Sequence, residues 1–562
     1  MKDEGRKKIE EIMAGMQFPK NFKCAELGFK HLCRAKNFGL ENYLSCQERR
    51  PNLVKEPSEQ LAFGFAPTAV TIDDVMAPKG YTGLSAFHKY WGKKPIECLG
   101  FLVEKLTRPH DLVVDPFVGS GLIARECALR QRRFIGIDIN PVSIELARMV
   151  SDLPSLDQYD AALRTMERAV RGPIDQSYLF ADGKTASHYL WDRDRLREVW
   201  ISRKGKGGRE VRKPTQHDHD LFAKYADYKS RFIRPLRFFQ NSRINTATTL
   251  TLSDIFTGRA LRNIDLIIES VPAAPENLRR ALLLTLTASI GQMSSMVFAI
   301  TGRGKTTGES TPKVEVGSWV IGYWRPPLHF EINVWNCFLR RADKLVMILS
   351  DLGQPRAFTI AETADAVVAR SADVALLNEN SISALRHLPE ASVALVLTDP
   401  PHSDRIPYLE LSELWNAILG KDSRFEDEIV VSNARERGKT KSQYNQQMAT
   451  FLCEVDRVLV PGGTLAILFN ARDAESWNGL VQDEAAVSLR YYGSFPMSYS
   501  ANSVVQDNRD GAMKSDYVLI YRKPGNGMRN GFFEKHVHTI PGWSEDFPQA
   551  KGARDAIHVS NS

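Results

Sequence analysis

The chain has 562 residues, of which 43% are hydrophobic and 25% are charged. These values are ordinary for a soluble globular protein, and the length allows two or three domains. The formal net charge of +7 suits a polyanionic partner but does not establish one. No apolar run approaches the roughly 18 residues of a membrane helix, and no apolar segment follows the basic N-terminus, so we expect neither a membrane span nor a signal peptide.

The seven cysteines lie far apart in the sequence and form no CxxC pair. This spacing fits neither a disulfide framework nor a zinc ribbon. We therefore expect no metal site, and a cytoplasmic location in which thiols stay reduced.

Residues 1–75 look like an appended N-terminal helical segment. Its apolar residues have a mixed helical spacing, and basic side chains lie among and beside them, at positions 20, 23, 30, 34 and 36. These cations could contact a phosphate backbone, whereas a solvated helical cap is the simpler interpretation.

The motif HKYWGKKP, residues 88–95, comes next. It precedes a helix that we expect over residues 96–106, with Pro95 at the first turn. Lys93 or Lys94 could contact a carboxylate or a phosphate of a ligand. The alternative is that the motif only begins the helix.

The motif DPFVGSG, residues 115–121, follows a short buried strand. Pro116 ends that strand, Gly119 and Gly121 open a turn, and we expect a helix over residues 122–129. Glycines let backbone N–H groups approach a ligand closely, and a helix N-terminus favours negative charge. A strand, a glycine turn and a helix in this order therefore predict a cradle for a polar ligand.

A second strand, residues 134–138, ends in the carboxylate of Asp138. An acid at this place suits the two hydroxyl groups of a ribose, although such acids also serve as plain helix caps. Pro141 then begins the next helix. Residues 111–150 thus alternate strands and helices in the manner of an α/β domain.

The alternation stops near residue 151 and resumes near residue 366, which is too long a stretch for a loop, so we expect an inserted domain. A basic, glycine-containing segment near its start could lie along phosphates, with Arg203, Lys204 and Lys206 as the candidate contacts. Residues 230–239 interleave cations with aromatic residues. That mixture suits either stacking on bases or an amphipathic turn that faces the core.

The sheet resumes at about residue 375, and Asn380 follows the first strand of this half. A buried strand over residues 393–398 then leads into DPPH, residues 399–402, and a helix follows near Tyr408. The remaining elements are expected in this order: a helix over 451–459, a turn at 461–463, strands over 464–469 and 517–521, and a loosely ordered tail or small accessory piece over 524–562.

Together, DPFVGSG, the acid at residue 138 and DPPH after a long insert resemble the S-adenosylmethionine-dependent DNA amino-methyltransferases, which methylate N6 of adenine or N4 of cytosine. The resemblance implies a doubly wound, Rossmann-like α/β methyltransferase sheet with a large inserted α+β domain. The first, cofactor-binding half of the core would be residues 76–150 and the second, catalytic half residues 366–523. Residues 151–365 would recognise the target.

The resemblance also implies S-adenosyl-L-methionine as the cofactor and DNA as the partner, with restriction or other defence proteins as possible further partners. In the family, the motif before the glycine turn closes over the methionine end of the cofactor. Asn380 stands where the family has an acid that contacts the adenine. The residues that we expect to contact the cofactor are Asp115, Phe117, Gly119, Gly121, Asp138, Asn380 and Lys94.

An exocyclic amino group is a poor nucleophile, because its lone pair is delocalised into the base. Asp399 could accept one amino hydrogen bond and the carbonyl of Pro400 the other, with Pro400 and Pro401 fixing the backbone. Positioning and electrostatic stabilisation would then carry the rate. The base must first be flipped out of the duplex.

His402 stands where the family has an aromatic residue that stacks on the flipped base. Histidine is planar but smaller, so Tyr408 or Trp415 could supply the missing aromatic surface. Three alternatives stay open: an RNA base methyltransferase with the same core, a non-catalytic nucleic-acid-binding homologue, and a protein glutamine methyltransferase. The last of these would need Asn in place of Asp399.

Overall fold

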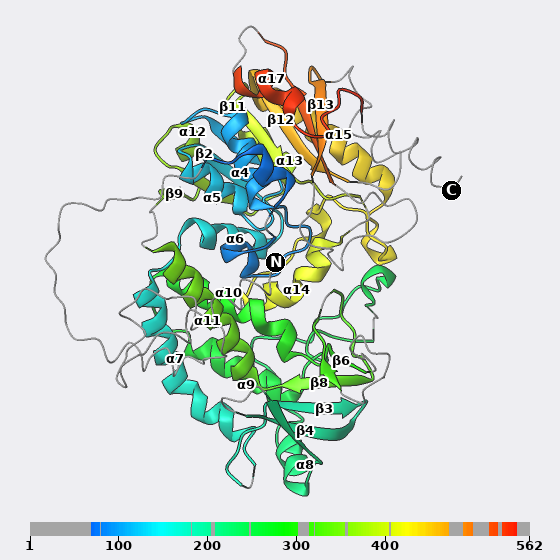
Figure 1. Cartoon of the computed structure of the whole chain (residues 1–562). Coiled ribbons are helices and arrows are strands. Elements are labelled where there is room, and N and C mark those ends of the chain that lie inside the picture. Colours follow the sequence, from blue (N-terminus) through cyan, green and yellow to red (C-terminus); the bar gives the residue numbers. More distant parts are fainter. Residues whose placement is uncertain are drawn as a thin grey trace, which may run out of the picture. The chain divides into compact units, whose positions relative to one another are not determined.

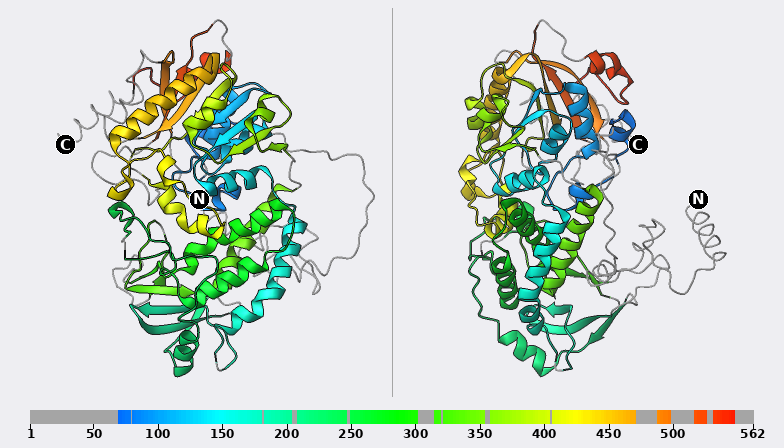
Figure 2. Two further views of the ribbon diagram at one scale, coloured as in Figure 1. Left: turned by 180° about the vertical axis from the view of Figure 1, so that it is seen from behind. Right: turned by 90° about the vertical axis from the view of Figure 1, so that its left-hand side faces the viewer.

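The computed structural model describes the following residues (Figures 1 and 2): 69–78, 80–180, 182–203, 208–246, 249–301, 314–319, 321–353, 358–403, 406–470, 487–497, 516–525 and 531–547. Of these, residues 202–203 and 208–210 belong to one compact unit and all the others to a second unit. The expected N-terminal segment lies largely outside the described residues. Among the helices that can be described, none has both the length and the apolar character needed to cross a membrane.

An eight-stranded sheet forms the centre of the second unit. Its strand order is β13-β14-β12-β11-β1-β2-β10-β9. The neighbours from β12 to β9 pair in parallel, whereas β14 runs antiparallel to both β12 and β13. The bounds are β1 Leu112–Asp115, β2 Arg133–Ile137, β9 Ile360–Ala361, β10 Val374–Leu377, β11 Val393–Thr398, β12 Leu459–Phe469, β13 Arg490–Met497 and β14 Asp516–Arg522.

The central strands are buried because helices cover both faces of this sheet. Val113 and Leu395 point into the core on one face, and Val114 and Val396 into the core on the other. Strands covered on both faces are continuous apolar runs, as these are. The first face carries α4 Ile96–Leu106, α5 Leu122–Leu129, α6 Pro141–Ser151 and α17 Gly531–His536; the second carries α12 Ala364–Val368, α13 Ser381–His387 and α15 Lys441–Val458.

Several predicted elements have the predicted bounds, and others differ from them. The helices over 96–106 and 122–129 and the strand over 393–398 occur as expected. The helix expected over 451–459 begins ten residues earlier, because Thr440 caps the backbone N–H of Gln443. The turn expected at 461–463 is part of β12.

A six-stranded sheet lies in the region where we expect the insert. Strand β3 pairs antiparallel with β4 and β8, and β6 with β7 and β8. The strands are β3 His188–Asp192, β4 Arg195–Arg203, β5 Gly208–Arg212, β6 Val297–Ile300, β7 Glu315–Val316 and β8 Leu328–Ile332. The other α-helices of the described residues are α3 Ile72–Met76, α7 Leu156–Gln176, α8 Gln216–Ala223, α9 Gly258–Ser270, α10 Glu276–Met293, α11 Val334–Leu352 and α14 Tyr408–Ile418.

A buried ion pair ties α9 to β8. Nε of Arg259 lies 2.7 Å from Oε1 of Glu331, and Nη2 lies 2.9 Å from Oε2, with both side chains 1% exposed. The guanidinium also lies 4.2 Å from the ring centre of Tyr189. The bidentate geometry compensates the cost of burying both charges only while both partners are present.

We expect Arg259→Met to lower the free energy of unfolding by about 3–5 kcal/mol, because it leaves the carboxylate of Glu331 buried without its counter-ion. The double variant Arg259→Met/Glu331→Leu should recover most of that loss. The matched control is Arg325→Met, whose partner Asp194 is 89% exposed; it should cost at most about 1 kcal/mol. Urea denaturation measures all three, and equal losses in the single and double variants would contradict the argument.

The glycine turn between β1 and α5 has little space for side chains. Gly121 is the N-cap of α5 and has φ +75°. A Cβ atom on it would lie 2.2 Å from Cα of Ala147 in α6. Glycine is therefore required both by the backbone conformation and by the packing of α6.

Gly121→Ala should destabilise the protein by about 2–3 kcal/mol more than the matched change Gly438→Ala, because α6 must move to accept the methyl group. Gly438 has φ +62° and the same left-handed backbone conformation as Gly121, and a Cβ there meets nothing within 4 Å. Its substitution reports the backbone strain alone, which is about 1 kcal/mol. Thermal unfolding of the two variants measures the difference, and equal melting temperatures would refute the packing argument.

Candidate active site

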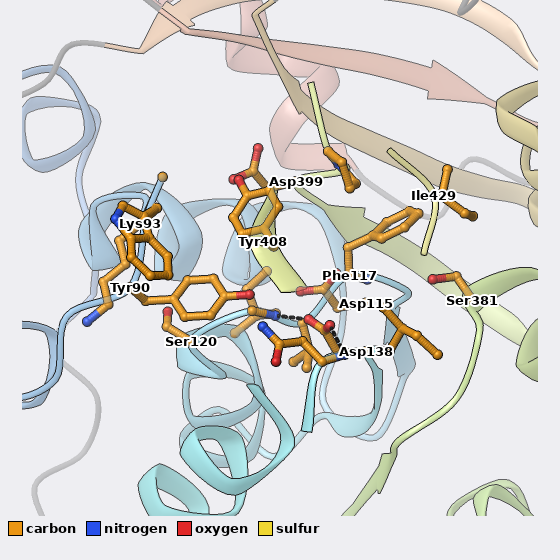
Figure 3. Close-up of a pocket in the computed structure, with 18 of the residues that line it drawn as sticks. Tyr90, Lys93, Asp115, Phe117, Ser120, Asp138, Ser381, Asp399, Tyr408 and Ile429 are labelled. Atoms are coloured by element: carbon orange, nitrogen blue, oxygen red, sulfur yellow. Dashed lines mark hydrogen bonds between the residues drawn. The ribbon is translucent and has the colours of Figure 1, made fainter. Parts of the chain in front are cut away.

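A pocket lies at the carboxyl ends of the central parallel strands (Figure 3). Strands β1 and β11 are neighbours there, with Val113 opposite Leu395. The chain continues from β1 toward β2 on one side and from β11 toward β12 on the other, which makes this a topological switch point, the usual ligand site of such sheets. The predicted meeting of the two motifs at one sheet edge is confirmed.

Asp138 is fixed beside the glycine turn. Its Oδ2 accepts from the backbone N–H of Gly119 at 2.9 Å, and its Oδ1 accepts from that of Asn140 at 2.8 Å (Figure 3). Burial raises the pKa of Asp138 to about 6, although these backbone donors oppose the rise. A carboxylate has about four acceptor positions, so it can still accept hydrogen bonds from a ligand.

Asp115 joins the two strand ends. Its Oδ1 accepts from Oγ1 of Thr398 at 2.7 Å and from the backbone N–H of Phe117 at 3.1 Å. Burial raises the pKa of Asp115 to about 8, against these two donors. The carboxyl group is therefore mostly protonated near neutral pH. Both Asp115 and Phe117 line the pocket, as do Gly119 and the neighbouring Ser120.

Lys94 lines the pocket but has other partners than the anionic ligand that we expected. Its Nζ lies 3.0 Å from Oδ2 of Asp399 and 2.6 Å from Oδ2 of Asp516. The neighbouring Lys93 donates to the backbone carbonyls of Ser85 and His88. Both lysines thus bind groups of the protein itself. An anionic ligand would have to compete with these groups for either ammonium.

His402 does not present a stacking face to the pocket. Its Nε2 lies 3.0 Å from Oδ1 of Asp399 and 3.2 Å from the carbonyl oxygen of Leu468 in β12. The buried ring packs edge-on against Phe469, with 5.1 Å between ring centres. The expected stacking role therefore does not match this arrangement. Pro401 lines the pocket, and Pro400 is buried next to it.

Asn380 is the N-cap of α13. Its Oδ1 accepts from the backbone N–H groups of Ile382 and Ser383, and its Nδ2 donates to the carbonyl of Asp427 at 2.8 Å. It lines the pocket, as expected, but both ends of its amide are already engaged. Its expected contact with an adenine stays a prediction that would require an exchange of these partners.

Two tyrosines form a wall of the pocket (Figure 3). The rings of Tyr90 and Tyr408 stack with centres 5.8 Å apart and planes 20° apart. Tyr408 was singled out from the sequence, whereas Tyr90 was passed over although it lies in the HKYWGKKP motif. Trp415 is only 1% exposed and stacks on Trp91, so it offers no surface to a ligand. Sequence reasoning also missed Ser381 and the segment 427–429, which carry no motif.

The two basic segments predicted to contact phosphates differ in how far the structure describes them. Lys204 and Lys206 lie outside the described residues, and only the backbone of Arg203, at the end of β4, is described. In the segment 230–239, the aromatic rings face the protein: Phe238 stacks on Tyr323, and Phe239 packs on Phe425. The arginines at 231, 234 and 237 are exposed. Phe238 and Phe239 thus pack against the protein, while the three arginines lie at the surface, where Arg231 contacts Glu269.

Comparison of the sequence with known proteins gives matches to methylases. Residues 52–149 match the family model described as DNA methylase. The Type II methyltransferase M.Cfr9I of Citrobacter freundii is 36% identical over 53 residues, and M.XycI of Xanthomonas campestris pv. cyanopsidis is 38% identical over 53 residues. Each of these two matches covers 9% of this chain and 18% of the relative.

Among solved structures, a DNA modification methylase of Thermus thermophilus is similar over 28% of this chain and 56% of its own, with 20% identity and a TM-score of 0.17. A structure of the same protein with S-adenosyl-L-methionine has 22% identity and a TM-score of 0.16. The likeness to this family depends on the sequence matches, and the matched residues 52–149 contain both DPFVGSG and Asp138. The two curated relatives are matched over less than a fifth of their own length.

Proposed function

We propose that this protein transfers the methyl group of S-adenosylmethionine to an exocyclic amino group of adenine or cytosine in DNA. The observation that carries the proposal is the pocket in which the glycine turn after β1 and Asp399 after β11 meet. The strand order and the helices on both faces support a Rossmann-like methyltransferase core. The Type II names of the two matched relatives support a restriction-modification setting.

The loop from Phe117 to Gly121 and the carboxylate of Asp138 would hold the cofactor. The fit rests on two features: the loop lines the pocket beside Asp138, and Asp138 retains acceptor capacity for ribose hydroxyls in addition to its two backbone donors. The bound cofactor would supply the methyl group as a sulfonium. Asp115 would hold the β1 and β11 ends together through Thr398.

Asp399 would accept a hydrogen bond from the amino group of the flipped-out base. Its side chain is 21% exposed and lines the pocket, whereas Lys94, its partner, is buried. A carboxylate at this point also stabilises the positive charge that develops on the amino nitrogen. The ring of Tyr408 borders the same space and could take the place of the missing aromatic residue at 402.

We propose residues 151–365 as the target-recognition domain. The exposed arginines at 231, 234 and 237 give this region cations for a phosphate backbone. The same region contacts the catalytic half directly, because Nδ2 of Asn241 donates to Oε2 of Glu410 in α14 at 2.7 Å. This contact would keep the target-recognition region in a constant position relative to the catalytic pocket.

Cofactor affinity should depend on the charge of Asp138. Ribose hydroxyls donate to the ionised carboxylate, and burial raises the pKa of Asp138 to about 6. The affinity should therefore be highest above this pKa and should fall as the pH decreases through it, by up to about tenfold per pH unit. Titration calorimetry with S-adenosylmethionine between about pH 5 and about pH 7 measures this. In Asp138→Asn the dependence should disappear; its persistence would assign the titration to another group.

Asp399→Ala should reduce kcat by about 10²–10³-fold, because it removes an acceptor that acts on the reacting amino group. Cofactor affinity should fall far less than kcat, because Asp399 is one of several carboxyl groups that line the pocket. Methyl transfer from labelled cofactor to DNA and to RNA, followed by mass spectrometry of the nucleosides, measures the rate and identifies the product. A product on RNA alone would replace DNA as the substrate, and an Asp399→Ala protein of full activity would refute the assigned role.

A further inference from the structure

We propose that His402 and Lys94 are positioning residues that hold the carboxylate of Asp399 from its two sides, and that His402 acts as a hydrogen-bond donor where the family has a stacking ring. The inference deepens the proposed function, since it depends on Asp399 as the acceptor of the amino group. The evidence is the set of contacts around Asp399, which comes from three separate parts of the chain.

The contacts of His402 determine which of its atoms carries hydrogen. Nε2 lies within hydrogen-bond distance of Oδ1 of Asp399 and of the carbonyl oxygen of Leu468. A carbonyl oxygen only accepts, and an ionised carboxylate oxygen only accepts. Nε2 must therefore be protonated and donate, and the carbonyl on β12 helps fix the plane of the ring. This arrangement needs a nitrogen at the position, which a phenylalanine or tyrosine ring does not supply.

Lys94 holds the second oxygen of Asp399 from the opposite side. Its Nζ is shared between Oδ2 of Asp399 and Oδ2 of Asp516, the first residue of β14, and Asp516 is itself held by Nδ2 of Asn470 at 3.0 Å. Asp516 is fully buried. Burial alone would lower the pKa of Lys94, yet the two carboxylates outweigh it and raise that pKa above its ordinary value. The lysine therefore stays charged.

The cluster limits both the orientation and the charge of Asp399. With Oδ1 engaged by His402 and Oδ2 by Lys94, rotation of the carboxylate would break a hydrogen bond or an ion pair. Among the described residues, Lys94 is one cation against the two carboxylates of Asp399 and Asp516, and this excess of negative charge suits a site where positive charge develops on nitrogen. Asp399 lines the pocket and is 21% exposed, and a carboxylate has more acceptor positions than His402 and Lys94 occupy, so it can accept the amino hydrogen as well.

The two variants His402→Gln and His402→Phe test the donor. Glutamine places an N–H group near the position of Nε2, whereas phenylalanine restores the ring of the family but no donor. We expect kcat of His402→Gln within about threefold of the unchanged protein and kcat of His402→Phe lower by about tenfold or more, with cofactor affinity unchanged in both. The exposed His387, changed to Phe, is the matched control and should leave kcat unaltered.

Equal activity of His402→Phe and the unchanged protein would overturn the proposal, and so would equal losses in the Phe and Gln variants, which would indicate packing alone. If the unchanged protein itself transfers no methyl group to DNA or RNA, the proposed function fails instead. The two failures are thus distinguishable.

Lys94→Met and Asp516→Asn test whether the charges around Asp399 act on it, because the two variants should shift the pH profile of kcat/KM in opposite directions. Loss of the cation should move the acid limb of the pH profile of kcat/KM to higher pH, and loss of the neighbouring negative charge should move it to lower pH. Asp516→Asn keeps the proposal testable if Lys94→Met does not fold. Shifts of the same sign, or no shift in Asp516→Asn, would contradict it. Among the described residues, the titratable groups around Asp399 and its partner Lys94 are His402, Asp516, Asp115, Tyr81 and Tyr408.

Discussion

The parallel pairing of β1 with β11 is the contact on which the site depends. These strands are separated by nearly three hundred residues, and Oγ1 of Thr398 donates to Asp115 across the seam between them. Thr398 immediately precedes Asp399, so this hydrogen bond sets the distance between the acid and the glycine turn. Because Asp115 is buried and mostly protonated near neutral pH, the junction adds little charge of its own.

A second buried network joins the proposed target-recognition region to the catalytic half. Glu410 accepts from Asn241 on one side and from Arg437 on the other, and Arg437 also contacts Glu428. Glu428 in turn accepts from the backbone N–H of Leu409, next to Tyr408 in the pocket wall. Groups that are this deeply buried stay satisfied only as a set. The position of Tyr408 is therefore linked to the packing of the insert.

The sequence was sufficient for the local elements and for the meeting of the two motifs. Pro116 and the glycines after it defined α5, and the apolar run before Asp399 defined β11, because these signals lie within a few residues of the element. The contact of Lys94 with Asp516 could not be predicted, because Asp516 is 422 residues further along the chain and carries no motif. The role of His402 depends on the backbone carbonyl of Leu468 in β12, and the position of a backbone group cannot be predicted from the residue types around it.

The charge left around Asp399 has a consequence for turnover in the proposed reaction. The donor enters as a sulfonium cation and leaves as a neutral thioether, so the attraction of Asp138 and of the Lys94 cluster acts on the first species and not on the second. The negative charge that favours binding of the donor would therefore not hold back the neutral by-product. An enzyme built in this way would discriminate between its donor and by-product by electrostatics, without any contact that reads the sequence around the base.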